Sequence, residues 1–317
     1  MKTMFNLTTS SGDLDRFSDS GDLLRMMDGF DGVELMHFEE DVRGIIPKDR
    51  VIGYHTSFFY YWIDFFLGNQ DALLYEFCSM EQCHKFYGGK TRDVLVSRIK
   101  RELELAKLYG AEYVVFHAAD CAPTEFFSQS FRHSDELVID AVCDLINEAF
   151  AEEDSIMLLL ENLLVPGMRF TNPEMTQRLM DGIHYANKGI MLDTGHLMHT
   201  DSSLRTQEDG VKYINKQLDE HGDLVKYIRG IHLNKSLTGE YYEEIKKSPP
   251  VLSNEFQERE FQIFTHVFKL DLHKPFTCKG VKELIQRIDP DYLTFEFISM
   301  DKDELARYLK EQKEALK

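Results

Sequence analysis

The chain has 317 residues, of which 43% are hydrophobic and 29% charged, as is ordinary for a protein with a sizeable core. Its formal net charge of −19 disfavours nucleic-acid binding, because an acidic surface repels phosphate backbones. We find no secretion signal, no apolar stretch long enough to span a membrane and no Cys-x-x-Cys pair, so we expect a cytoplasmic protein without disulfides.

Eight short, mostly apolar segments recur along the chain, as is typical of parallel strands buried on both faces. They cover residues 3–8, 32–36, 51–55, 113–117, 156–161, 189–193, 228–233 and 292–297. Helical patterns separate the later ones, with apolar stripes over 95–106, 137–150 and 281–288. Asp301 with Glu304 predicts a capping box at the start of the last helix. Strands that alternate with helices eight times favour a single (β/α)₈ TIM barrel domain over residues 1–317.

Two connections are longer than a barrel needs, and we expect them to be long loops after strands 3 and 7. Residues 56–90 are rich in Phe and Tyr, and residues 235–264 are polar. Both follow strands, so both belong to the face where barrels carry their chemistry. We expect the aromatic cluster at 58–66 to be a packed loop or a subunit contact rather than a substrate wall.

Six consecutive strands end in a residue type that binds metals. These residues are His55, His117, Glu161, Asp193, His232 and Glu296, and His196 follows Asp193 by three positions. A lone histidine at a strand end is usually structural, and a lone carboxylate often caps the next helix. Several carboxylates at one barrel mouth would repel each other unless a cation neutralised them, so the joint pattern favours a metal centre. The remaining histidines, His199 among them, are expected to be surface or ordinary structural residues.

These motifs resemble those of the xylose-isomerase-like barrel superfamily, which includes ketose 3-epimerases, inosose dehydratases and the type 2 apurinic-site endonucleases. The similarity covers strands 2 to 8, and its best pieces are Leu-Glu-Asn at Glu161, Asp-Thr-Gly-His at 193–196, Ile-His-Leu-Asn at His232 and Phe-Glu-Phe at Glu296. The resemblance implies a principal divalent metal held by Glu161, Asp193, His232 and Glu296. The endonuclease branch implies additional ligands, which match His55, His117, His196, Asp271 and His273 here.

Two reaction classes fit such a site, which suits Mn²⁺, Co²⁺, Zn²⁺ or Mg²⁺. We predict a metal-dependent isomerase or epimerase of carbohydrate metabolism that acts on a sugar or sugar phosphate through an enediolate. Glu161 and Glu296 would move the proton, and His196 would orient a hydroxyl. The alternative is a multi-metal, zinc-type phosphoester hydrolase, for which a small phosphorylated metabolite suits the charge better than DNA does. A non-catalytic sugar-binding barrel is a third reading, and a homo-oligomer is left open.

Overall fold

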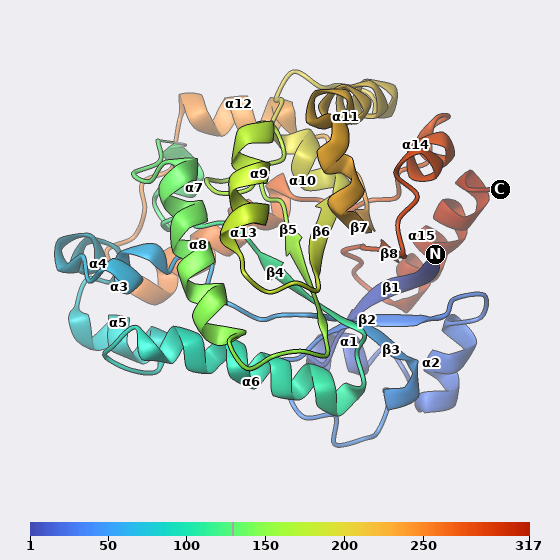
Figure 1. Cartoon of the computed structure of the whole chain (residues 1–317), viewed down its shortest axis with the longest axis horizontal. Helices are drawn as coiled ribbons and strands as arrows, with labels where there is room; N and C mark the ends of the chain where they lie inside the picture. The colour runs from blue at the N-terminus through green and yellow to red at the C-terminus, as the bar shows by residue number, and fades with distance from the viewer. Residues whose placement is uncertain (129) are drawn as a thin grey trace.

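The computed structural model describes residues 1–128 and 130–317, and its eight parallel strands close into a barrel in the order β1 to β8 (Figure 1). The strands are β1 (Lys2–Thr8), β2 (Gly32–Met36), β3 (Val51–His55), β4 (Tyr113–His117), β5 (Met157–Glu161), β6 (Lys188–Asp193), β7 (Ile228–Leu233) and β8 (Tyr292–Phe295). The predicted barrel is confirmed. The strand ends differ from the predicted ones by at most two residues, and the largest difference leaves Glu296 just beyond β8.

Helices surround the barrel in Figure 1. Their bounds are α1 (Ser11–Leu14), α2 (Ser20–Met26), η1 (Lys48–Arg50), α3 (Ile63–Leu67), α4 (Gln70–Phe77), α5 (Met80–Tyr87), α6 (Asp93–Tyr109), α7 (Glu125–Ser128), α8 (Asp135–Ala149), α9 (Pro173–Gly182), α10 (Thr194–His199), α11 (Gln207–His221), η2 (Gly222–Tyr227), α12 (Gly239–Lys247), α13 (Phe256–Leu270), α14 (Val281–Ile288) and α15 (Lys302–Ala315). The three predicted apolar stripes lie on α6, α8 and α14. None of the helices among the described residues has the length and apolar character needed to cross a membrane.

The long connections after β3 and β7 contain helices rather than irregular loops. The first holds α3, α4 and α5, because Asn69 and Ser79 accept hydrogen bonds from the backbone N–H groups of Ala72 and Gln82 and so start two helices. The second holds α12 and α13. The predicted capping box of α15 is only half formed: Asp301 accepts from the N–H of Glu304, but the Glu304 carboxylate reaches one residue further, to Met300.

Apolar side chains fill the lower barrel and leave the carboxyl-terminal end to polar residues. The interior cluster includes Met4, Ile52, Val115, Leu159 and Met191. The strand register sets the level of the polar residues above this cluster, since residue 117 pairs with 161 and residue 193 with 232. Predicted ligands that are far apart in sequence therefore meet at one height in the barrel mouth.

Candidate metal centre

Four side chains converge at the centre of the mouth. Glu161, Asp193, His232 and Glu296 each offer one donor atom, and these four atoms lie within 4.8 Å of one another. His232 Nδ1 lies 3.1 Å from Glu161 Oε1 and 3.2 Å from Glu296 Oε2. This is the set of residues that the family resemblance implies for the principal metal.

The donor set fits a divalent cation. Glu296 Oε2 is buried, yet it has no hydrogen-bond partner among the described residues. Burial, together with the nearby charge of Glu296, raises the pKa of Asp193 to about 7. Burial alone would also raise the pKa of Glu161, but the imidazoles of His232 and His117 hold it well below its usual range. Several carboxylates this close need positive charge among them, which a metal ion or protonated histidines supply.

Glu161 uses both of its carboxylate oxygens. His55 Nε2 and His117 Nε2 lie 3.0 and 3.1 Å from Oε2. His232 Nδ1 and His196 Nδ1 lie 3.1 and 3.3 Å from Oε1. One oxygen thus faces the central group and the other faces a pair of flanking imidazoles, so this carboxylate would be shared between the two groups if both held an ion.

A second flanking group also borders the centre. His196 Nε2 and His273 Nε2 lie 3.0 and 2.8 Å from Asp271 Oδ2. One donor atom each from Asp193, His196 and His273 also fall within 4.8 Å of one another. Ser236 accepts hydrogen bonds from the backbone N–H groups of residues 272 and 273 through Oγ, which fixes this turn. The structure therefore brings all nine predicted site residues together.

The sequence reading missed Glu34, which lies inside the barrel on β2. Its Oε1 is 2.8 Å from Nε2 of His232, and its Oε2 accepts hydrogen bonds from Tyr113 and Thr294. A carboxylate at the outer nitrogen of a metal-binding histidine orients the ring. The feature in the sequence that could have indicated this role is a charged glutamate within the otherwise apolar run Gly-Val-Glu-Leu-Met.

Asp193 also caps α10, as the simpler explanation of a strand-end carboxylate proposed. Its Oδ1 accepts from the N–H of His196 at 2.6 Å, and its Oδ2 accepts from Asn234 Nδ2 at 2.7 Å. A Cβ on Gly195 would lie 1.9 Å from Asn234 Oδ1, so the glycine of Asp-Thr-Gly-His is required by this close approach. Asn234 was not predicted.

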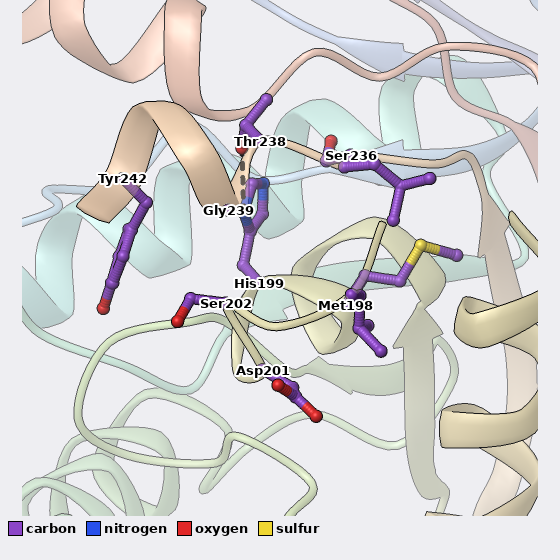
Figure 2. Close-up of a pocket in the computed structure, with 10 residues that line it drawn as sticks. Met198, His199, Asp201, Ser202, Ser236, Thr238, Gly239 and Tyr242 are labelled. Carbon is purple, nitrogen blue, oxygen red and sulfur yellow. Dashed lines mark hydrogen bonds between the residues drawn. The ribbon is translucent and has the colours of Figure 1, made fainter. Parts of the chain in front are cut away.

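His199, which was expected to be a surface or structural residue, is buried and contacts Asp271. Its Nε2 lies 3.4 Å from Asp271 Oδ1, and Ser236 Oγ donates to the same oxygen at 2.9 Å. Figure 2 shows the contact between the His199 ring and Thr238, where Nδ1 and Oγ1 are 3.4 Å apart. His199 and Ser236 thus contact Oδ1 of Asp271, whereas His196 and His273 contact Oδ2.

The centre is most open at His117, whose side chain is 40% exposed, compared with 13% for Asp271 and 12% for Glu296. His117 borders a cavity of about 50 Å³ whose wall includes Phe58, Phe59 and Tyr60. Part of the aromatic segment therefore faces the site. Tyr61 and Trp62 are fully buried, as expected for a packed loop.

Comparisons with known proteins agree with the barrel. Residues 86–316 match the sequence model of a family described as xylose isomerase-like TIM barrel. Among solved structures, a D-tagatose 3-epimerase-like protein is 17% identical, covering 100% of this chain and 97% of that chain with a TM-score of 0.50. The 3-keto-D-glucoside 4-epimerase YcjR from E. coli, in its apo form, is 13% identical over 99% of this chain and 98% of that chain, with a TM-score of 0.52. No curated protein matches. At these identities the solved structures show a shared fold, and the match to the family model shows that the chain belongs to the xylose isomerase-like TIM barrel family.

Proposed function

We propose that the chain is a divalent-metal-dependent enzyme, and that the reaction its geometry supports best is hydrolysis of a phosphoester with two or more metal ions. The observation that carries this proposal is the division of Glu161 between two sets of donors, with His55 and His117 on one oxygen and His232 and His196 on the other. A single central ion would leave His55 and His117 without a metal to bind.

The residues divide into three sets of ligands. Glu161, Asp193, His232 and Glu296 would hold the principal ion. His55 and His117 would share a second ion with Glu161, and His196, Asp271 and His273 would hold a third. Mixed imidazole and carboxylate donors suit Zn²⁺, Mn²⁺ or Co²⁺ better than Mg²⁺.

When bound, several ions would activate water and neutralise the charge of a phosphoester as it is displaced. The chain itself positions the ions and shapes access at His117. Glu161 is poorly suited to act as a general base, because both of its oxygens face imidazoles and its pKa is held well below the usual range. The net charge of −19 favours a small phosphorylated metabolite over DNA as the substrate.

A sugar isomerase or epimerase is the second candidate. It is supported by Glu161, Asp193, His232 and Glu296, which would suffice to hold one ion without the flanking residues. The two epimerase-related structures named above share the fold. In this reaction Glu161 and Glu296, from β5 and the end of β8, would remove and return a proton, and His196 would orient a substrate hydroxyl.

Metal counting separates the two candidates. The metal-free chain is loaded with Zn²⁺ or Mn²⁺, dialysed and analysed for metal per chain. Two or three equivalents, with phosphate released from small phosphomonoesters, would support hydrolysis. One equivalent, with solvent deuterium incorporated at a ketose carbon, would support the isomerase. Protein that retains no metal would refute both.

A further inference from the structure

The cavity beside His117 lies where the connections that follow β3, β4 and β5 meet. Its wall includes Phe58, Phe59, Tyr60, Phe126, Leu163 and Val165. The connections after β4 and β5 are joined by a bridge between residues 119 and 167, which fixes the wall. Because His117 is the most exposed of the candidate ligands, a substrate that reaches the metal centre passes this cavity.

The wall is largely apolar, and its polar groups are poorly suited to bind an anion. No lysine or arginine is among the described residues that line it. The Tyr60 hydroxyl donates to Glu260 at 2.6 Å, and the Thr56 hydroxyl donates to the carbonyl of Val115 at 2.7 Å. Apart from His117, the described side chains of the wall offer an anion no cationic donor, so burying a phosphate or carboxylate here would have a high free-energy cost.

Asp120 is the exception in this wall, because it is buried and offers a free acceptor. Its Oδ1 accepts from the backbone N–H groups of Trp62 and Ile63 at 2.6 and 3.0 Å. Its Oδ2 has no hydrogen-bond partner in the part of the chain that the structure describes. A buried acceptor without a donor is energetically unfavourable, so a ligand that donates an O–H or N–H to this oxygen would bind more tightly.

The size of the cavity limits the group that it can take. A volume of about 50 Å³ gives room for about four non-hydrogen atoms, given that one water needs about 10–15 Å³ on this measure. A nucleobase or a second sugar ring does not fit. A short carbon segment that ends in a hydroxyl does.

We propose that this cavity is the specificity subsite of the metal centre, and that it takes a short, uncharged substrate segment whose terminal O–H or N–H donates to Asp120 Oδ2. This proposal rests on the proposed function only in assigning the substrate side of the centre to His117. It assigns the substrate to small polyol or sugar compounds whose only charged group is at the metal-facing end.

Binding of a probe tests the subsite without any turnover. 2-Fluoroethanol carries the donor, and 1-fluoropropane, which has the same number of non-hydrogen atoms, carries a methyl group in place of the hydroxyl. In ¹⁹F NMR titrations of the full chain we expect the alcohol to bind about fivefold more tightly than the fluoroalkane, the equivalent of one hydrogen bond. Equal affinities would overturn the role of Asp120.

Variants locate the probe. Asp120→Asn keeps the Oδ1 acceptor for Trp62 and Ile63 but puts an N–H₂ group in place of Oδ2, so it should remove or reverse the preference for the alcohol. Val165→Phe should abolish binding by filling the cavity. Asp140→Asn, at an exposed ion pair between α8 and α9, should change nothing.

If Asp120→Asn fails to fold, Phe126→Ala replaces it, since the enlarged cavity should bind a longer alcohol, 4-fluorobutanol, more tightly than the parent does. Probe binding that none of the folded variants changes would overturn the proposal. If the chain retains no metal but still binds the probe as expected, the proposed function is refuted while the assignment of the subsite is not.

Discussion

Replacing Glu34 by glutamine should weaken metal binding although Glu34 is not itself a ligand. Glu34 Oε1 lies 2.8 Å from Nε2 of His232, whose Nδ1 faces Glu161 and Glu296. A carboxylate at Nε2 keeps the ring proton on that nitrogen, leaves the Nδ1 lone pair for the metal and makes it more basic. Glutamine keeps an oxygen near Nε2 but carries no charge.

The size of the effect follows from these contacts. Loss of such an outer carboxylate typically lowers metal affinity about 10- to 100-fold, or about 1.4–2.7 kcal/mol. We expect the upper half of this range, because the Tyr113 and Thr294 hydroxyls donate to Glu34 Oε2 at 2.5 and 3.1 Å and would meet an amide N–H₂ group in one orientation of the glutamine. Tyr113→Phe is the matched control, since it removes one donor and keeps the charge. Tyr113→Phe should lower the metal affinity only a few-fold.

Zinc affinity is measured by titrating the metal-free chain against a chelator, and stability is measured by thermal unfolding with and without zinc. The stabilisation on adding zinc should fall by about 2 kcal/mol in Glu34→Gln at fixed free metal. The metal-free variant should be at least as stable as the parent, because one carboxylate has left a crowded anionic cluster. Unchanged zinc affinity with a less stable metal-free form would refute this reasoning and make Glu34 a purely structural residue.

Four further changes test the site and the fold. His55→Asn should lower the zinc content by one ion per chain in elemental analysis, while the central set keeps its ion. Asp271→Asn should remove a different ion, so the double variant should hold one, and an unchanged count would contradict three ligand sets. Glu153 pairs with Lys107, and although burial opposes this, the ion pair and backbone N–H groups lower its pKa to about 2. The stabilisation of the fold by ionised Glu153 is therefore complete above about pH 4.5 and disappears as the pH falls through about 2. The free energy of unfolding of Glu153→Gln should be about 1–2 kcal/mol below that of the parent at pH 7, and this difference should shrink over that pH range. Leu159→Ala in the barrel interior should cost about 2–5 kcal/mol in urea unfolding, and a loss under 1 kcal/mol would mean that the interior is loosely packed.

The strands and the candidate ligands at their ends could be predicted because parallel strands leave an unambiguous pattern in sequence. A strand covered on both faces is an apolar run, and the residue that ends it at the mouth must be polar, so His117 and Glu161 mark both the strand end and the site. Asp271 and His273 follow a helix rather than a strand. Only the family resemblance indicated them, and the structure brings them beside His196.

The supporting residues could not be assigned because their contacts run across the barrel. Glu34 lies in an apolar run of the kind found inside any buried strand. No local sequence pattern indicates that it faces His232, which is 198 residues later. His199 did leave a signal, since it lies three residues after His196 on the same helix, α10, and such residues share a face. That spacing could have linked both histidines to one acid. The chemistry of Asp120 depends on two backbone N–H groups of another connection, which no local pattern reveals.

The charge of the cluster supports the proposal that it holds several ions rather than one. Five carboxylates meet in and directly beneath the mouth, at Glu34, Glu161, Asp193, Asp271 and Glu296. With neutral histidines, one divalent ion leaves three negative charges uncompensated in a buried site, which would repel an anionic substrate. Three ions leave one positive charge, which a phosphoester anion neutralises. An uncharged sugar has no such need, so a preference for phosphorylated over free sugar ligands that grows with each ion loaded would follow from the cluster itself. If the preference for phosphorylated ligands did not depend on metal content, a single central ion and sugar isomerisation would be favoured instead.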